Sequence, residues 1–146
     1  MQIIPSTSFK YGIDSISASP RESIEAGTKY LLNMNNYWKD FIFEKNERIK
    51  FVLASYNVGL GHVIDGRNLA IKYSKDPNKW EDNVAYFVLQ KSKPMFYNDL
   101  VVKFGYCRGQ EPCNYVKEIL NRYEHYKNVI DIKYPKGIIA TVIHKN

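Results

Sequence analysis

The sequence predicts a mainly α-helical domain, and three observations support that class. Apolar residues recur at helical spacing over most of residues 1–127. Serine, proline and glycine stand where such helices would begin and end. The chain has 146 residues, of which 45% are hydrophobic and 25% charged, and this is enough for one folded domain with one core.

The first helix is expected over residues 20–37. Ser19 is a good N-cap, Pro20 suits the first turn, and Glu22 completes a capping box. The expected apolar face comprises Ile24, Gly27, Leu31 and Met34, with Tyr30 and Trp38 beside it. Residues 1–18 contain proline, glycine and several serines, so we expect loop or short turns there.

Four further helices are expected, at about residues 47–56, 61–73, 79–90 and 112–126. The first of these four has one apolar face, which is formed by Ile49, Val52, Leu53 and Tyr56. It ends at a turn containing Gly59 and Gly61, and we expect it to be buried at the centre of the domain. A loop is expected from Lys93 through Tyr97, and Pro112 suits the first turn of the last helix.

After Asn128 the pattern changes from helical spacing to alternation. Ile130, Ile132 and Tyr134 alternate with polar residues, and an apolar run follows at 138–143. The sequence therefore predicts a domain over residues 1–127 and a short β-prone C-terminal tail over residues 128–146. That tail is expected to pair as a hairpin or to remain a loose, aggregation-prone end.

The charge and composition exclude several classes of protein. A net charge of +6 attracts nucleic acid, acidic lipid or an anionic polymer, but the basic residues are scattered and form no nucleic-acid recognition motif. Nonspecific surface charge is the simpler interpretation, and no nucleic-acid partner is expected. No apolar stretch is long enough to cross a membrane, and the opening residues lack the pattern of a signal peptide. The 12 tyrosines suit either a small core or a sugar-binding cleft.

The two cysteines, Cys107 and Cys113, are too few for a disulfide framework. We expect them to be free and partly buried, although a disulfide across a short loop is the alternative in an oxidising compartment. Only three histidines accompany them, so zinc is poorly supported. No metal or other cofactor is expected.

Three short stretches share a pattern with a known family. They are residues 1–7 (MQIIPST), 54–59 (ASYNVG) and 111–116 (EPCNYV). In this order and spacing they resemble the catalytic domains of lytic murein transglycosylases with a goose-type lysozyme fold, and in particular the membrane-bound F group. Two positions depart from the family pattern, because Ile4 replaces a methionine and Val58 replaces an alanine.

This resemblance implies a lysozyme-like helical fold, an activity and a substrate site. The activity is cleavage between N-acetylmuramic acid and N-acetylglucosamine in peptidoglycan, in the periplasm or cell envelope. One glutamate acts first as the acid and then as the base that closes a 1,6-anhydro ring, without a cofactor. The residues expected to bind the glycan strand are Met1, Gln2, Tyr56, Asn57 and Tyr115. Tyr115 is also expected to orient the acid.

The position of the catalytic acid is the largest departure from the family. By resemblance, the family glutamate stands upstream of Met1, so we expect the 146-residue chain to have little activity as written. An internal methionine taken as the start, a gene fragment or a natural remnant would each produce this pattern. The alternatives are a non-catalytic glycan-binding remnant, a hydrolytic lysozyme relative and, least favoured, a basic helical domain that binds nucleic acid. Glu111 and His62 are weak substitutes, because each has a simpler role near a helix start.

Overall fold

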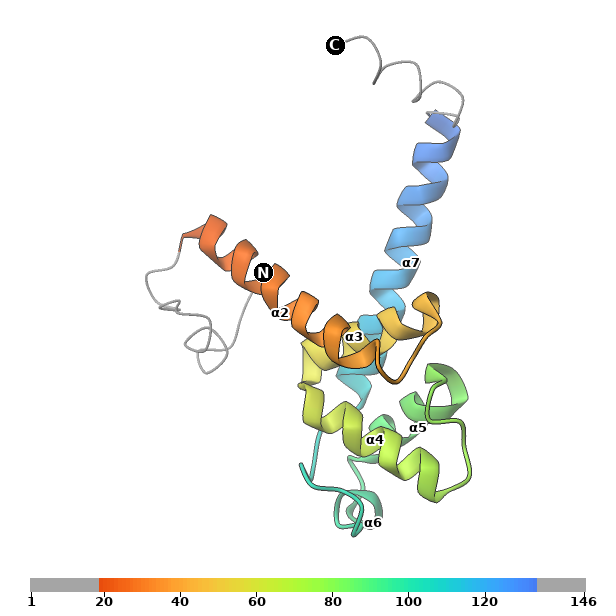
Figure 1. Ribbon diagram of the computed structural model, residues 1–146. Coiled ribbons are helices and arrows are strands. Elements are labelled where there is room, and N and C mark those ends of the chain that lie inside the picture. The colour runs from red at the N-terminus through yellow and green to blue at the C-terminus, as the bar shows by residue number, and fades with distance from the viewer. Residues whose placement is uncertain (1–18, 134–146) are drawn as a thin grey trace.

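The computed structural model describes residues 19–133, and the side chains up to residue 130 (Figure 1). Within this range the chain forms helices and connecting turns without a strand, so the predicted mainly α-helical class is confirmed. The elements are α2 (Pro20–Trp38), α3 (Lys45–Val58), α4 (Leu60–Lys72), the π-helix η1 (Trp80–Val84), α5 (Ala85–Gln90), α6 (Pro94–Tyr97) and α7 (Gln110–Lys133).

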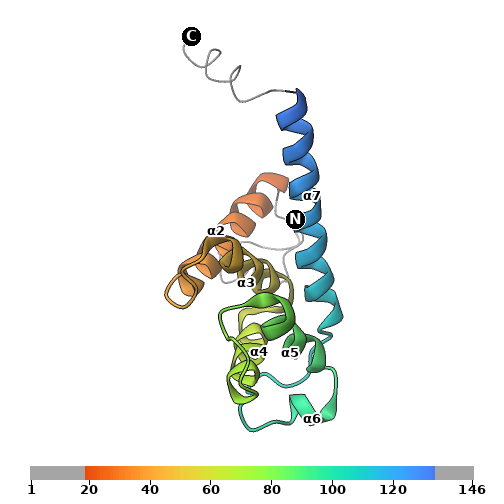
Figure 2. The ribbon, with the colours of Figure 1, turned by 90° about the vertical axis from the view of Figure 1, so that its right-hand side faces the viewer.

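Helix α3 is the centre of the fold, as the sequence predicted. Helices α2, α4 and α7 all pack against it (Figures 1 and 2). Its middle is the buried run Phe51, Val52, Leu53, Ala54 and Ser55. Because these five consecutive residues point to every side of a helix, α3 can only be stable when it is surrounded. Ile49, which was expected on the same apolar face, is instead 41% exposed.

Side-chain hydrogen bonds cap the start of helix α2 and anchor its other end to α3. The predicted capping box is present, since the Glu22 amide donates to the Ser19 hydroxyl and the Ser19 amide donates to the Glu22 carboxylate at 2.8 Å. At the other end, the buried indole N–H of Trp38 donates to the hydroxyl of Ser55 at 2.8 Å. This bond joins α2 to α3. Ile24 lies on the exposed side of α2 and not on the predicted apolar face.

Three sequence expectations about element boundaries are corrected. The segment after Lys93 was predicted as a loop, but it forms α6, because proline fits the first turn of a helix. The single helix predicted at 79–90 is interrupted within η1, where Asp82 has a φ of +56°. The last helix was predicted to end near residue 126, but α7 continues to Lys133.

The extension of α7 also corrects part of the predicted tail. Residues 128–133 are helical, although their alternating pattern predicted extended structure. Each residue added to an existing helix needs no new nucleation, so a weak local β preference at residues 128–133 does not end the helix. Residues 134–146 and 1–18 lie outside the described residues, and the expectations about them stay predictions.

A buried polar network fastens the segment that leads into α7. The carboxylate of Asp65 on α4 accepts from the Lys91 ammonium at 2.6 Å and from the backbone amides of Lys103 and Phe104 at 2.8 and 2.9 Å. The side chains of Asp65 and Lys91 are fully buried. Gly109 completes this junction, since a Cβ there would lie 2.0 Å from the carbonyl oxygen of Val88. The start of α7 is therefore fixed against α4 and α5.

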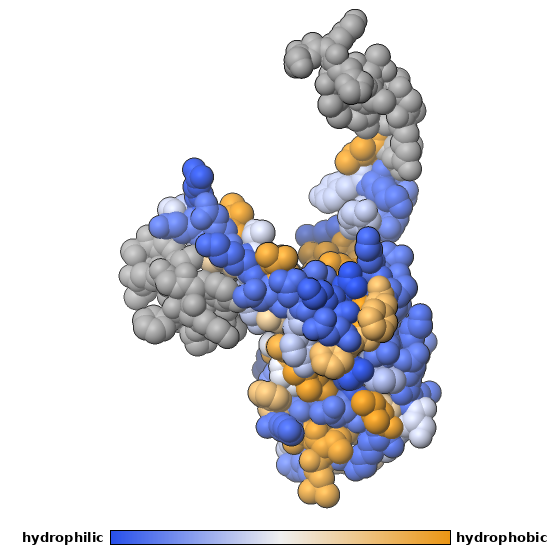
Figure 3. Space-filling view, in the orientation of Figure 1, coloured by the Kyte–Doolittle hydropathy of each residue, from blue (hydrophilic) through white to orange (hydrophobic). Residues whose placement is uncertain are grey.

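The surface is mixed in character. The C-terminal half of α7 extends away from the other helices (Figures 1 and 2). Hydrophilic and hydrophobic residues are interspersed over the face that Figure 3 shows. Among the described helices, none combines the length and the apolar character that a membrane span requires.

Candidate functional site

The end of α3 has the geometry that the sequence predicted for a ligand-facing turn. Gly59 adopts φ = +96° and ψ = 143°, a conformation that residues with a side chain rarely adopt. A Cβ there would meet no atom within 4 Å, so the glycine is required by its backbone conformation and not by lack of space. The turn leaves Asn57 exposed in the last turn of α3, where its amide group is available for hydrogen bonding.

Next to Asn57, three tyrosines from three helices meet. The rings of Tyr56 on α3 and Tyr115 on α7 are nearly parallel, with an interplanar angle of 17° and centroids 6.4 Å apart. Tyr30 on α2 is closer, with its centroid 5.5 Å from that of Tyr56 and the planes tilted by 47°. We call Tyr30, Tyr56 and Tyr115 the tyrosine cluster. All three side chains are partly buried.

Tyr56 has an unusual environment for a phenol. Its hydroxyl oxygen is buried and has no hydrogen-bond partner among the described residues. Burial raises the pKa of Tyr56, and the neighbouring Tyr115 and Tyr30 raise that pKa further. The phenol is therefore neutral at physiological pH. A buried hydroxyl without a partner costs about 1–3 kcal/mol, so ring packing and not a hydrogen bond to the described residues holds this phenol.

The structure thus brings two of the predicted site residues, Tyr56 and Tyr115, into contact, with Asn57 next to Tyr56 in the chain. Met1 and Gln2 lie outside the described residues, so their part in the site stays a prediction. Tyr30 was not predicted as a site residue. Its signal in the sequence was weak, because a tyrosine beside an apolar helix face usually fills the core.

The two weak substitutes for a catalytic acid have structural roles. His62 Nδ1 lies 3.0 Å from the Lys91 ammonium, which makes that ring nitrogen an acceptor within the buried network. Burial lowers the pKa of His62, and the positive charge of Lys91 lowers it further. Glu111 is exposed in the first turn of α7 and forms a 3.5 Å ion pair with Arg108. Neither arrangement resembles an acid held in an apolar cleft.

Both cysteines are free, as expected. Burial raises the pKa of Cys107, and it raises the pKa of Cys113 to about 11. Each thiol is therefore protonated at neutral pH and poorly reactive. In the part of the chain that the structure describes, no group of three or more acidic, histidine or cysteine side chains is arranged to hold a metal.

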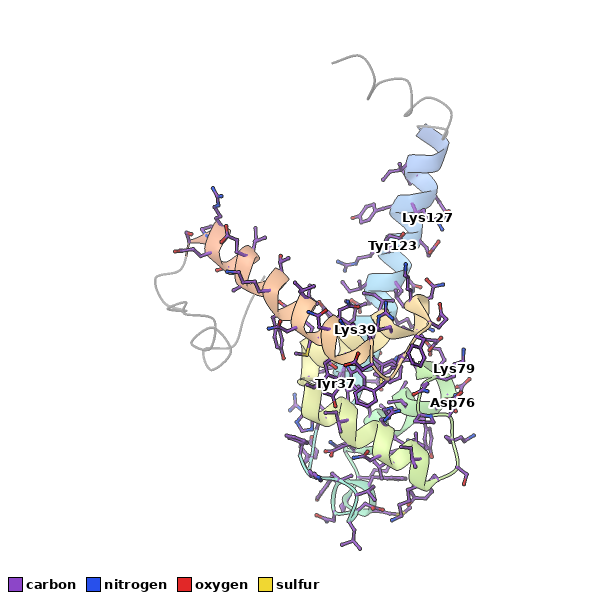
Figure 4. The ribbon with its side chains drawn as sticks, viewed as in Figure 1. Tyr37, Lys39, Asp76, Lys79, Tyr123 and Lys127 are labelled. Atoms are coloured by element: carbon purple, nitrogen blue, oxygen red, sulfur yellow. The ribbon has the colours of Figure 1, made fainter. Side chains whose placement is uncertain are left out.

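A groove of about 620 Å³ lies farther along the seam between α3 and α7. Its lining is mostly apolar with charged edges, and it comprises Lys45, Asn46, Ile49, Lys50, Leu53, Ile119, Leu120, Tyr123 and Glu124. Figure 4 shows Tyr123 on the part of α7 that extends from the body. The exposed face of Ile49 is explained by this groove.

Comparison with known proteins identifies the family to which this chain belongs. The model of the transglycosylase SLT domain family matches residues 1–83, more than half of the chain, so the chain belongs to that family. The resemblance seen in the three sequence motifs is therefore confirmed, and the helical architecture agrees with the lysozyme-like fold that it implied.

Several similar curated proteins carry the name membrane-bound lytic murein transglycosylase F. The protein of Pseudomonas fluorescens is 36% identical over 124 residues, which are 85% of this chain and 24% of that protein. The protein of Shewanella loihica is 38% identical over 125 residues, or 85% of this chain and 25% of that protein. The protein of Pasteurella multocida is 41% identical over 113 residues, or 75% and 22%. The chain thus spans about a quarter of the length of these relatives.

Proposed function

We propose that this domain binds peptidoglycan glycan strands and acts in their lytic cleavage, with formation of a 1,6-anhydro ring. Membership of the SLT family and the name of the relatives support the reaction class. The observation that carries the proposal is the arrangement at the end of α3. There, the exposed Asn57 stands beside two contacting tyrosines, and the hydroxyl of Tyr56 is buried without a hydrogen-bond partner among the described residues.

This arrangement has the chemistry that a glycan needs. A sugar ring offers an apolar face and a rim of hydroxyl and N-acetyl groups, so aromatic rings and amides bind it together. We assign the face of one sugar to Tyr56 and an N-acetyl or hydroxyl group to Asn57. Gln2 would supply a second amide and Met1 an apolar contact. These two assignments rest on the family motif.

The cleavage step needs a group that first donates a proton to the glycosidic oxygen and then removes one from the muramoyl C6 hydroxyl. We assign no described carboxylate to that role. Asp65 is held by three donors in the buried network, and Glu111 is exposed and paired with Arg108. By family resemblance, the acid is a glutamate that Tyr115 would orient.

The cellular location and the binding partner follow from the same proposal. The relatives are named as membrane-bound proteins, so we propose that the domain acts at the cell envelope, where its +6 charge favours an anionic wall polymer. The alternative within the same fold is a domain that binds glycan strands without cleaving them.

Binding to purified peptidoglycan sacculi tests the proposal. The wild-type chain should co-sediment with sacculi, and Asn57→Ala should weaken binding by about two- to tenfold, the usual effect of one lost hydrogen bond. Tyr115→Ala should weaken it similarly. The matched control is Tyr126→Ala, an exposed tyrosine farther along α7, which should bind as wild type. Absence of binding by the wild-type chain would overturn the proposal.

Product analysis separates lytic cleavage from hydrolysis and from binding without cleavage. An active domain that contains the family glutamate releases muropeptides with 1,6-anhydro ends, whereas a hydrolytic relative leaves reducing ends. A domain that binds sacculi and releases neither product is the non-catalytic alternative.

A further inference from the structure

The tyrosine cluster contains one member, Tyr30, that neither the family motifs nor the proposed glycan contacts include. It comes from α2, whereas Tyr56 and Tyr115 come from α3 and α7. Its ring is the nearer of the two neighbours of Tyr56, with a centroid separation of 5.5 Å against 6.4 Å for Tyr115. The ring contact most able to restrict Tyr56 therefore comes from α2.

The position of Tyr30 is itself fixed by the packing of α2 on α3. Ala26 and Gly27 are buried and lie one turn before Tyr30 on the same face of the helix. Helices α2 and α3 pack against each other. Farther along α2, the bond from Trp38 to Ser55 holds the two helices in register. Tyr30 thus projects from a rigid helix and packs against the core.

Tyr56 needs such support because its own hydroxyl supplies none. That oxygen is buried without a hydrogen-bond partner among the described residues, so no polar contact with them fixes the phenol. A tyrosine ring turns about two side-chain bonds, and here its neighbours must select the orientation. Tyr115 contributes a nearly parallel ring and Tyr30 a tilted one, and the two together leave fewer orientations than either alone.

We propose that Tyr30 is a positioning residue of the glycan site, which holds the Tyr56 ring in the orientation that receives the sugar. This role rests on the proposed function of Tyr56 and adds a third helix to the site. Tyr30 acts through its ring, so Tyr30→Phe should keep the positioning of Tyr56 and Tyr30→Ala should lose it.

The test uses the 146-residue chain with Tyr30→Ala and Tyr30→Phe. The matched control is Tyr37→Ala, because Tyr37 is also a partly buried tyrosine of α2 but packs on Trp38 and Phe41 instead of Tyr56 (Figure 4). Far-UV circular dichroism checks the fold of each variant. If Tyr30→Ala does not fold, Tyr30→Leu keeps apolar volume without an aromatic ring and takes its place.

Two measurements are made on each variant. The first is the ionisation of Tyr56, followed by NMR of ring-labelled tyrosine and assigned with Tyr56→Phe. Loss of the Tyr30 ring should uncover the phenol and lower the pKa of Tyr56 towards its ordinary value. The second is the affinity for a purified tetrasaccharide of alternating N-acetylglucosamine and N-acetylmuramic acid. Tyr30→Ala should weaken it by about two- to tenfold, as expected for one aromatic pair.

The outcomes separate the two proposals. Tyr30→Phe should have the wild-type pKa of Tyr56 and the wild-type tetrasaccharide affinity. Tyr37→Ala should lower stability without changing that pKa or that affinity. A Tyr56 signal and an affinity that are unchanged in Tyr30→Ala would overturn the positioning role. Weak binding by Tyr30→Phe with a normal Tyr56 signal would also overturn it, because the Tyr30 hydroxyl would then contact the glycan directly. If the wild-type chain binds no tetrasaccharide, the proposed function fails, and the NMR signal alone still shows whether Tyr30 holds Tyr56.

Discussion

Replacing Asp65 with alanine should destabilise the domain more than most single substitutions. The Asp65 carboxylate is the only charged partner that the structure gives the fully buried ammonium of Lys91 among the described residues. It also accepts the backbone amides of Lys103 and Phe104. The variant would leave the buried ammonium of Lys91 without a counter-charge and two partly buried amides without their carboxylate acceptor. Breaking one side of a buried ion pair costs about 3–5 kcal/mol, a large part of the roughly 5–15 kcal/mol that stabilises a typical domain.

Urea unfolding followed by circular dichroism at the helical minimum measures this effect. The informative comparison is the double variant Asp65→Ala with Lys91→Met, which removes the buried charge together with its partner. Since the main cost in Asp65→Ala is the unpaired ammonium, the double variant should be more stable than the single one. Asp65→Asn keeps an acceptor for the amides and should fall between wild type and Asp65→Ala.

Two results would refute this reasoning. The first is a loss of less than about 1 kcal/mol in Asp65→Ala, which would mean that water or a shifted backbone replaces the carboxylate at little cost. The second is a double variant no more stable than the single one. In that case the amides of Lys103 and Phe104, and not the charge of Lys91, would dominate the effect.

Two further predictions concern His62 and Cys113. Burial lowers the pKa of His62, and the positive charge of Lys91 lowers it further. As pH falls, the unfolded chain therefore takes up a proton at this histidine before the native chain does. The stability that neutral His62 contributes is complete above its ordinary pKa of 6.5 and is lost as pH falls below that value. His62→Gln should therefore lose less stability than wild type between about pH 7.5 and about pH 5.5 in urea titrations. Because the pKa of Cys113 is raised to about 11, this thiol should react with a colorimetric thiol reagent at neutral pH only after denaturant is added.

Local sequence signals predicted the features that depend on a few neighbouring residues. The capping box of Ser19 and Glu22 needs only four consecutive residues, and it is present. The turn after α3 needs only Gly59, whose positive φ was implied by a glycine directly after an apolar helix. The burial of α3 was also predictable, because an apolar run such as residues 51–54 cannot face water.

Other features depend on residues far apart in the chain, and the sequence did not indicate them. Asp65 and Lys91 are 26 positions apart, and either residue alone is more often found on a surface. The contact of Tyr30 with Tyr56 depends on how α2 crosses α3, which no local pattern specifies. The kink at Asp82 was also missed, because the sequence pattern over residues 79–90 is that of one continuous helix.

The candidate site lies where the buried run of α3 meets the exposed turn at Gly59. Tyr56 directly follows the most deeply buried run of the domain, and a helix surrounded on several sides cannot shift without disturbing its neighbours. Gly59, three residues later, permits a sharp change of direction that keeps Asn57 exposed. The buried part of α3 therefore fixes the position of Tyr56, and the turn at Gly59 keeps Asn57 exposed to solvent. Because Tyr115 is placed by the start of α7, the Asp65 network, which fixes the segment before α7, should influence glycan binding even though its charges are buried away from solvent.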